Sequence, residues 1–307
     1  MPKPTDIKVT SAELSFESFP FRSPLKFGGR IMDSSRLMNV QVTVESRAGK
    51  HAAGFGSMPV GNIWAWPTDA VPPAETAAAM EDFAERVVRL TDGFDEYGHP
   101  IDIIYHISAE YHHLANVVAR DRKLAEPPPA LAQLVAASPL DAALHDAYGQ
   151  LNNCNSYQAL SSQFMRNDLA YYLDDQFQGE YLDRYALAEP KPRMPLYHLV
   201  GALDPITAAD VSTPLNDGLP ETLQDWIKAD GLTHLKIKLN GDDLEWDVER
   251  VVQIDRAAAE TQAERGCPQW YYSTDFNEKC QNVEYVLDFL QRLQTDSSSA
   301  YSRVQYI

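Results

Sequence analysis

From Met194 to Ile307, short apolar runs of strand length alternate with stretches whose apolar residues have helical spacing. Strands that alternate with helices favour right-handed βαβ units and a parallel sheet. This alternation of expected strands and helices constrains the fold of the C-terminal part more than any other feature. The expected strands are 196–200, 235–239, 270–274 and 303–307, and the expected helices are 220–229, 244–263 and 283–293.

Two common folds contain such a sheet, and the sequence separates them. No glycine-rich phosphate loop follows any expected strand, so a dinucleotide-binding fold has no support. We therefore predict a (β/α)8 barrel, in which active sites lie at the C-terminal ends of the strands. Lys236, Lys238 and Asp275 all fall at or near such ends.

The expected strand 235–239 carries two lysines, Lys236 and Lys238. Side chains alternate faces along a strand, so both lysines point to one side and the apolar residues to the other. Two ammonium groups about 7 Å apart repel, and each lowers the pKa of the other, which makes a lysine a usable base. An exposed strand whose lysines face water is the alternative.

Asp275 ends the next expected strand and has two interpretations. A carboxylate at a strand end can bind a metal ion. The run Asp275-Phe276-Asn277-Glu278 also has the form of a capping box for the following helix. The residue types alone do not separate the ligand from the cap.

The N-terminal part has the pattern of a small α+β domain. Alternation predicts strands at 7–19 and 36–46, and helical spacing predicts a helix over 74–90. Two stretches, 20–30 and 54–66, are rich in glycine, aromatic and cationic residues and are expected to be loops that cover a ligand.

A helix start is expected at Ser138, with Pro139 at the first position and Asp141 in the first turn. Residues 152–190 are expected to be an insertion with weak helices. His106, Glu110 and His113 have the spacing of one helical face and are candidate metal ligands, although such histidines are more often structural.

The chain has 44 acidic and 26 basic residues and a formal net charge of -18. This charge argues against nucleic acid and anionic membranes as partners. Residues 1–6 lack the apolar core of a signal peptide, and no run approaches the length of a membrane span. Cys154, Cys267 and Cys280 are odd in number, without metal-binding spacing, and are expected to be reduced. The predicted location is the cytoplasm.

Three short motifs occur in a distinctive order. Ser138-Pro139-Leu140-Asp141 leads toward the barrel, Lys236-Ile237-Lys238 ends its second strand, and Asp275-Phe276-Asn277 ends its third. In this order and spacing the chain resembles the enolase superfamily, specifically the mandelate racemase and muconate lactonizing enzyme branch, over nearly its whole length. The resemblance implies an N-terminal domain that caps the barrel mouth with two loops.

The resemblance also implies roles for individual residues. Lys238 would remove the proton α to a carboxylate, and Lys236 would stay near the substrate carboxylate and tune the base. Asp275 would bind Mg²⁺, which with the lysines stabilises the resulting enediolate. Substrate-binding residues would be Asn277 on the third strand and, on the loops of the first domain, Arg22, Lys26, Phe27 and Trp64.

The expected barrel ends early. A complete (β/α)8 barrel takes roughly 250 residues, whereas only residues 194–307 are available here. We expect a capping domain at 1–137, a linking helix and insertion at 138–193, and the first half of a barrel at 194–307. On this interpretation the chain is C-terminally truncated and lacks further metal ligands and a second acid–base group. It would then be inactive alone and associate through an open strand edge.

The predicted function is that of a Mg²⁺-dependent racemase or epimerase, dehydratase or cycloisomerase. Its substrate would be a small carboxylic acid, and the complete protein would be a homo-oligomer. A Schiff-base lyase on a similar barrel, with Lys236 or Lys238 as the nucleophile, is the alternative enzyme. A non-catalytic remnant or binding module is the third possibility.

Overall fold

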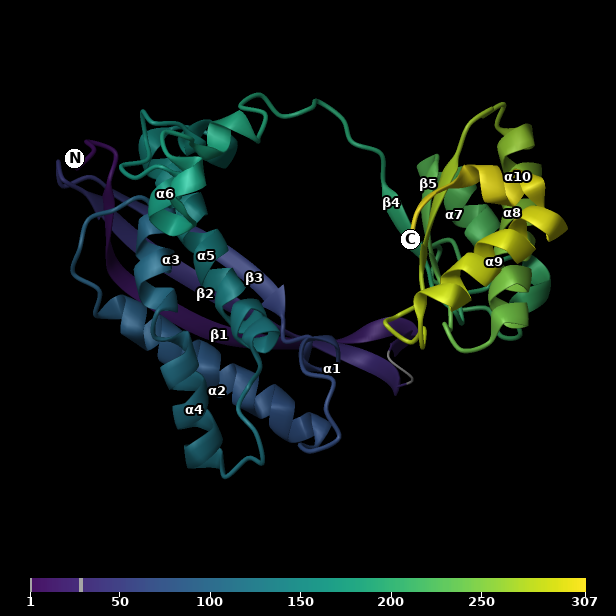
Figure 1. Cartoon of the computed structure of the whole chain (residues 1–307), viewed down its shortest axis with the longest axis horizontal. Helices are drawn as coiled ribbons and strands as arrows, with labels where there is room; N and C mark the ends of the chain where they lie inside the picture. Colours follow the sequence, from purple (N-terminus) through teal and green to yellow (C-terminus); the bar gives the residue numbers. More distant parts are fainter. Residues whose placement is uncertain (1, 28–29) are drawn as a thin grey trace. The chain divides into compact units, whose positions relative to one another are not determined.

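The computed structural model of the protein describes residues 2–27 and 30–307, and the side chains of all of these except 26, 27, 30 and 31. The chain divides into two compact units (Figure 1). The N-terminal unit comprises Met1–Ser23 and Asp33–Lys191, and the C-terminal unit comprises Pro24–Met32 and Pro192–Ile307. Each unit has its own apolar core.

The N-terminal unit is built on a sheet with the order β1 (Ile7–Phe27), β2 (Arg30–Ser46) and β3 (His51–Pro59). β2 and β3 are antiparallel, with Val40 opposite Gly56 and Val42 opposite Gly54. Both valines are buried, as are Met38 and Val44, so every second residue from Met38 to Ser46 of β2 faces the core. The predicted alternation over 36–46 is confirmed.

The two stretches expected to be loops, 20–30 and 54–66, are largely strand where the structure describes them, and that prediction is wrong. Residues 20–27 extend β1, and residues 54–59 lie within β3. The glycines at 54 and 56 indicated a loop, but β3 needs them for packing against a helix. Residues 28 and 29 lie outside the described residues, and among the others of these two stretches only 60–66 leaves the sheet and contains the short helix α1 (Asn62–Ala65).

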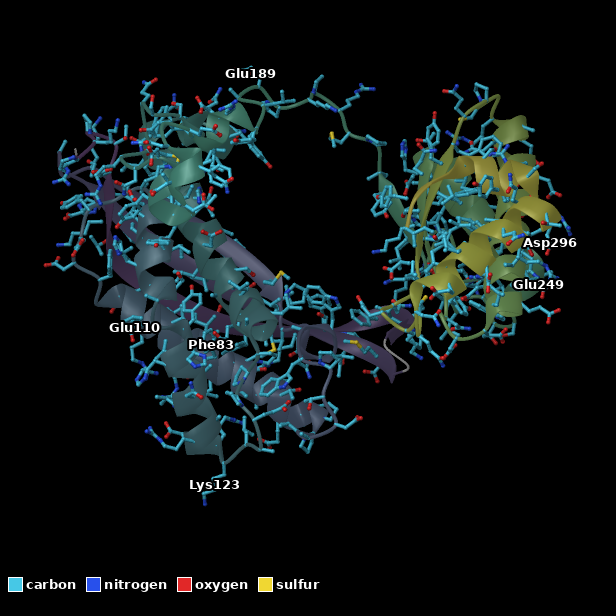
Figure 2. The ribbon with its side chains drawn as sticks, in the orientation of Figure 1. Phe83, Glu110, Lys123, Glu189, Glu249 and Asp296 are labelled. Atoms are coloured by element: carbon cyan, nitrogen blue, oxygen red, sulfur yellow. The ribbon has the colours of Figure 1, made fainter. Side chains whose placement is uncertain are left out.

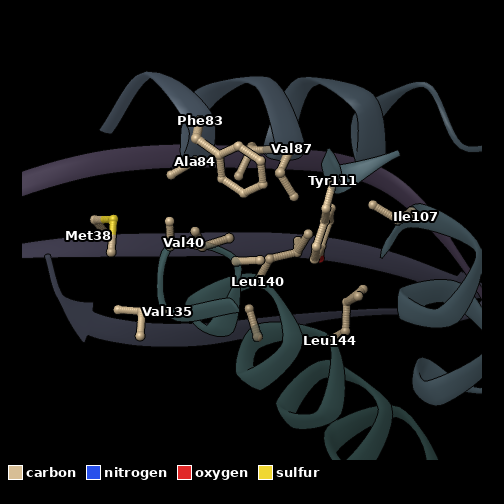
Figure 3. Packing of buried hydrophobic residues seen from close by; sticks show 14 of the residues in the cluster. Met38, Val40, Phe83, Ala84, Val87, Ile107, Tyr111, Val135, Leu140 and Leu144 are labelled. Atoms are coloured by element: carbon tan, nitrogen blue, oxygen red, sulfur yellow. The ribbon is translucent and has the colours of Figure 1, made fainter. Parts of the chain in front are cut away.

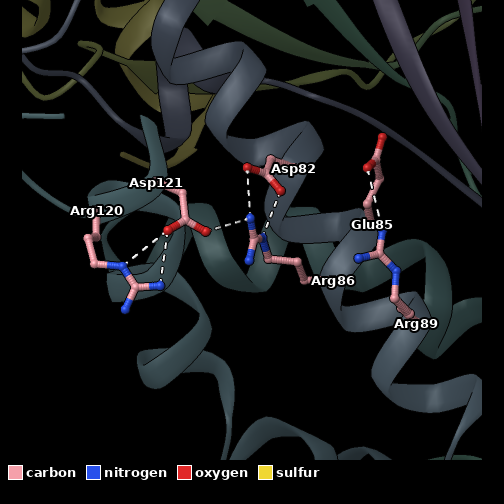
Figure 4. A network of polar contacts seen from close by, with 6 residues as sticks. All are labelled: Asp82, Glu85, Arg86, Arg89, Arg120 and Asp121. Atoms are coloured by element: carbon pink, nitrogen blue, oxygen red, sulfur yellow. Dashed lines mark hydrogen bonds and ion pairs between the residues drawn. The ribbon is translucent and has the colours of Figure 1, made fainter. Parts of the chain in front are cut away.

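Four longer helices complete this unit: α2 (Pro73–Asp92), α3 (Pro100–Ser108), α4 (Tyr111–Arg122) and α5 (Ala130–Asn152). Their apolar faces bury Phe83 and Val87 of α2, Tyr111 of α4 and Leu140 of α5 around Val40 (Figure 3). On the surface, Arg86 of α2 bridges Asp82 and Asp121, and so ties α2 to α4 (Figure 4).

Helix α5 begins at Ala130 and not at Ser138, so the predicted helix start is wrong. Pro139 lies inside α5 and has no N–H to donate to the carbonyl of Val135, four residues earlier. The hydroxyl of Ser138 donates to that carbonyl oxygen at 2.8 Å instead. The Ser-Pro pair therefore continues the helix, because the serine replaces the missing backbone hydrogen bond.

β3 packs directly onto the backbone of α5. A Cβ atom at Gly56 would lie 2.0 Å from the carbonyl oxygen of Pro139, and one at Gly54 would lie 2.2 Å from that of Ala143. The backbone N–H of Phe55 donates to Asp146 Oδ2 of α5 at 2.9 Å. Glycine is therefore required at both positions for the strand to approach the helix this closely.

The segment after α5 contains only short helices, among them α6 (Leu169–Tyr172), in agreement with the weak helices predicted for 152–190. Its anchor is Asp102 of α3, whose side chain is almost completely buried. Asp102 Oδ1 accepts hydrogen bonds from Tyr172 Oη and, at 2.9 Å, from Asn167 Nδ2. The carboxylate therefore fixes the segment to the helical layer.

The C-terminal unit is a parallel sheet with the order β4 (Tyr197–Val200), β5 (His234–Lys238), β6 (Tyr271–Asp275) and β7 (Val304–Tyr306). It alternates with helices α7 (Leu223–Asp230), α8 (Leu244–Glu264) and α9 (Val283–Asp296), followed by the short α10 (Ser298–Arg303), which was not predicted. Leu235 and Ile237 of β5 are buried in a core shared with these helices. The predicted fold class, an α+β domain followed by the βα units of half a barrel, is confirmed.

In the part of the chain that the structure describes, no helix is both long enough and apolar enough to cross a membrane.

Candidate functional site

The two lysines of β5 lie on the same face of the sheet. Leu235 and Ile237 are 1% and 0% exposed, whereas the side chains of Lys236 and Lys238 are 30% and 12% exposed. The apolar residues bind the strand to its helices, and the lysines occupy the opposite face, as the alternation predicted.

Asp275 joins the two lysines. It ends β6 and is the register partner of Lys238 in the parallel pair. Lys236 Nζ lies 2.8 Å and Lys238 Nζ 2.6 Å from the same carboxylate oxygen, Asp275 Oδ2. Two ammonium groups thus share one carboxylate oxygen, and the three side chains together carry one net positive charge. We call these three residues the lysine–aspartate cluster.

The shared carboxylate reverses one expectation from the sequence. The pKa of Lys236 is raised above its ordinary value, because its hydrogen bond to Asp275 outweighs the opposing effect of burial. The predicted lowering of lysine pKa by mutual repulsion is therefore wrong for Lys236, since a negative charge lies between the ammonium groups. Burial raises the pKa of Asp275, but hydrogen bonds from Lys236, Lys238 and a backbone N–H outweigh burial and lower it to about 2.

Asn277 also binds Lys238. Its Oδ1 accepts a hydrogen bond from Lys238 Nζ at 2.7 Å, and its Nδ2 donates to the carbonyl of Leu239 at 2.9 Å. The residue has a φ of 55°, a left-handed conformation that asparagine tolerates better than most side chains. Its contacts are those of a residue that positions the lysine, and substrate binding by Asn277 stays a prediction.

The alternative of Asp275 as a helix cap is wrong. The next helix, α9, begins at Val283, and its N-cap is Asn282, whose side chain accepts from Tyr285 N at 3.1 Å. Asp275 Oδ1 instead accepts the N–H of Asn277 at 2.9 Å within the turn that follows β6. The carboxylate therefore belongs to the lysine–aspartate cluster and not to a helix end.

A buried carboxylate that the sequence did not predict as functional fixes the loop after β5. Asp247 of α8 is 0% exposed and accepts the N–H groups of Asn240 at 2.7 Å and Gly241 at 2.9 Å, and the hydroxyl of Tyr285 at 2.7 Å. Gly241 has a φ of 78°, and a Cβ atom there would lie 2.7 Å from the carbonyl oxygen of Phe276. An acid in a first helical turn is ordinary in sequence, so only the fold reveals this role.

Arg22 lies on β1 and Trp64 on α1, both in the N-terminal unit, and their role in substrate binding stays a prediction. The side chains of Lys26 and Phe27 lie outside those that the structure describes.

The histidine candidates for a metal site do not share one helix. α3 ends at Ser108 and α4 begins at Tyr111, with Glu110 at the junction (Figure 2). His106 and His113 therefore lie on different helices. Among the residues described, no group of three or more His, Cys, Asp or Glu side chains is arranged to hold a metal ion.

The arrangement of an α+β domain followed by parallel βα units also occurs in solved structures. Solved structures with this fold include an enolase from Bradyrhizobium complexed with magnesium and mandelic acid (18% identity, TM-score 0.57, 94% of this chain and 59% of that chain covered). The fold is shared by the L-Ala-D/L-Glu epimerase from Bacillus subtilis, at 15% identity and a TM-score of 0.57, with 94% of this chain and 58% of that chain covered. It is also shared by a mandelate racemase/muconate lactonizing enzyme-like protein from Rubrobacter xylanophilus, at 18% identity and a TM-score of 0.51, with 94% of this chain and 58% of that chain covered.

The chain therefore shares the fold of these enolase and mandelate racemase/muconate lactonizing enzyme-like structures, in agreement with the fold that its motifs predicted. It spans about three fifths of the length of these structures. No protein-family model matches the sequence, and a comparison with curated proteins found no match.

Magnesium occurs in the Bradyrhizobium structure, but the residues described here do not fit that ion on their own. Mg²⁺ requires oxygen ligands in octahedral geometry. The cluster offers one carboxylate, whose Oδ2 is held by two ammonium groups and whose Oδ1 accepts a backbone N–H. The ammonium groups would repel a divalent cation at this position, so Asp275 alone does not form a magnesium site.

The cluster predicts a pH-dependent contribution of Asp275 to stability. Its folded-state pKa of about 2 lies below the ordinary value of 3.8, so its stabilisation is present above pH 3.8 and is lost as pH falls toward 2. Asp275→Asn should lower the free energy of unfolding by about 2 kcal/mol at pH 7, and by much less at pH 2. Urea denaturation at both pH values measures the difference.

Asp296→Asn provides the control, because Asp296 forms a surface ion pair with Arg292 on α9. That variant should lose less than about 1 kcal/mol at pH 7. If the Asp275→Asn difference stays unchanged down to pH 2, the carboxylate stabilises the fold through packing and not through its charge.

Proposed function

We propose that this chain carries the proton-transfer site of an enzyme that removes the proton α to a carboxylate, and that racemisation or epimerisation is the overall reaction. The observation that carries the proposal is the placement of Lys236 and Lys238 within 2.8 Å of one carboxylate oxygen at the ends of two adjacent parallel strands. Barrel enzymes of this kind have their active sites at these ends.

The charge of the cluster supports an anionic substrate. The chain as a whole has a net charge of -18, whereas the lysine–aspartate cluster carries one net positive charge while both lysines are protonated. A local positive site in an acidic protein attracts a small carboxylate and orients it toward the lysines. Dipeptides and α-hydroxy acids are the substrate classes that the names of the structural relatives suggest.

The two lysines are proposed to have different roles. The raised pKa of Lys236 keeps it as an ammonium ion, suited to bind the substrate carboxylate and the negative charge that develops on it. Lys238 is the more buried of the two and is held by Asn277 Oδ1. In its neutral form Lys238 Nζ takes the α-proton, so an N–H bond forms, the C–H bond breaks and the electron pair enters the enediolate.

Magnesium would require oxygen ligands in addition to Asp275, and the proposal places no step on the metal. Dehydration and cycloisomerisation begin with the same proton removal, and they are alternative outcomes after the enediolate. The first half-reaction is therefore the common feature to test.

Exchange of the substrate α-proton with deuterium tests that half-reaction directly. The purified chain is incubated in D₂O with mandelate, with L-Ala-L-Glu and with further dipeptides, with and without Mg²⁺, and the α-proton signal is followed by NMR. We expect the signal of at least one substrate to decay, in contrast to the inactivity that the sequence predicted for the chain alone. Absence of exchange with every acid would contradict the proposal.

Borohydride separates this chemistry from a Schiff-base lyase. Proton abstraction forms no covalent bond between enzyme and substrate, so reduction in the presence of a carbonyl substrate should leave the protein mass unchanged. A mass increase located at Lys236 or Lys238 would identify a Schiff base and replace the proposal.

A further inference from the structure

The N-terminal unit contains a cavity of about 410 Å³ between α3, α4, α5 and α6. This volume is in the range of small-molecule sites. The walls include the apolar side chains of Ile101, Ile104 and Leu134 and the rings of Tyr105, Tyr111 and Tyr172. The lysine–aspartate cluster belongs to the C-terminal unit, and none of its three residues lines this cavity.

One acidic group, Asp141 of α5, lines the cavity, and its side chain is 50% exposed. Its ion-pair partner among the described residues is His145, with Nε2 at 3.8 Å from Asp141 Oδ1. Burial lowers the pKa of His145, which leaves the imidazole neutral at pH 7. The Asp141 carboxylate thus lines the cavity, and among the described residues it has no ion-pair partner that is charged at pH 7.

The tyrosine rings form the other chemical feature of the cavity. Tyr172 is held in place because its hydroxyl donates to the buried Asp102, and the Tyr105 ring meets it edge to face with centroids 5.2 Å apart. Tyr111 is 5% exposed, and its hydroxyl has no hydrogen-bond partner among the described residues. Aromatic rings beside one carboxylate attract organic cations through the negative faces of the rings.

We propose that this cavity binds a small organic ammonium ion, with the positive nitrogen near Asp141 and the tyrosine rings and its alkyl groups against Ile101, Ile104 and Leu134. Two properties of the site favour a cation over a neutral apolar ligand. The carboxylate gains a charged partner, and the rings contribute a cation–π attraction in addition to apolar contact. Aromatic side chains held by neighbouring contacts also reduce the entropy lost on binding.

Choline and its neutral isostere 3,3-dimethyl-1-butanol test the charge directly, because they have the same shape and differ at the central atom. Isothermal titration calorimetry with the whole chain should show choline binding at least about tenfold tighter than the alcohol. Equal affinities, or no choline binding, would overturn the proposal. So would choline binding that weakens with protein concentration as the chain dimerises, because a second copy would then occupy the cavity.

Two variants locate the site without disturbing the core. Asp141→Asn keeps the side-chain size and should weaken choline binding about tenfold, and Tyr105→Leu keeps an apolar wall and should weaken it about fivefold. Glu110→Gln removes the same charge from an exposed position that does not line the cavity, and should leave the affinity unchanged. Equal losses in Asp141→Asn and Glu110→Gln would indicate a general surface charge effect and overturn the assignment.

Discussion

Lys238→Met is expected to lower the rate of α-proton exchange about a thousandfold, since a positioned general base contributes roughly 10² to 10⁴ in rate. Methionine keeps the length of the side chain and removes the amine. Asp275 would retain its 2.8 Å contact with Lys236, so the cluster should keep its shape. Exchange of mandelate or dipeptide α-protons in D₂O, measured by NMR at saturating substrate, gives the effect on the chemical step.

Two further variants show whether this loss is specific. Lys228→Met removes a lysine from α7 of the same unit, where its partner is Glu264 at 2.9 Å, and it should exchange at the original rate. Lys236→Met should raise KM as well as lower the rate, because its ammonium group is proposed to bind the substrate carboxylate. Undiminished exchange in Lys238→Met would exclude Lys238 as the base.

Gly56→Ala is expected to destabilise the N-terminal unit by about 4 kcal/mol or more, a large fraction of the stability of an ordinary domain. The new Cβ atom would lie 2.0 Å from the carbonyl oxygen of Pro139 and 2.8 Å from the backbone nitrogen of Ala143. Both contacts are with the backbone of α5, so no side-chain rotation relieves them. Thermal unfolding followed by circular dichroism should show a lower melting temperature or loss of the folded unit.

Gly93→Ala is the matched control, because Gly93 follows α2 with a φ of -90° and its nearest contact would be 3.6 Å away. That variant should change the free energy of unfolding by less than about 1 kcal/mol. If the two variants unfold at the same temperature, the close contact between β3 and α5 does not exist in solution.

The strands and helices of the C-terminal unit could be predicted because local sequence and tertiary environment agree there. Leu235 and Ile237 alternate with Lys236 and Lys238, and the structure buries the first pair and leaves the second on the opposite face. Asp275 was recognised as a group at the neighbouring strand end, but its contact with both lysines depends on the register of two parallel strands. Local sequence contains no information on that register.

The predictions of local structure were wrong where a residue typical of one local structure makes a contact with a distant part of the chain or lies inside a longer element. Ser138 and Pro139 have the chemistry of a helix start, yet the serine hydroxyl compensates inside a longer helix. Gly54 and Gly56 are typical of a loop, yet they allow a strand to approach that helix. The raised pKa of Lys236 was also unexpected, since it depends on a carboxylate 39 residues later in the chain.

The close contact of β3 with α5 also has a consequence for the order in which the chain is made. Phe55 and its acceptor Asp146 are 91 residues apart, and ribosomes add about 5 to 20 residues per second. The apolar face of the sheet therefore waits roughly 5 to 18 seconds for the helix that covers it. During that interval the uncovered apolar face of the nascent sheet would be a binding site for chaperones that act on the ribosome.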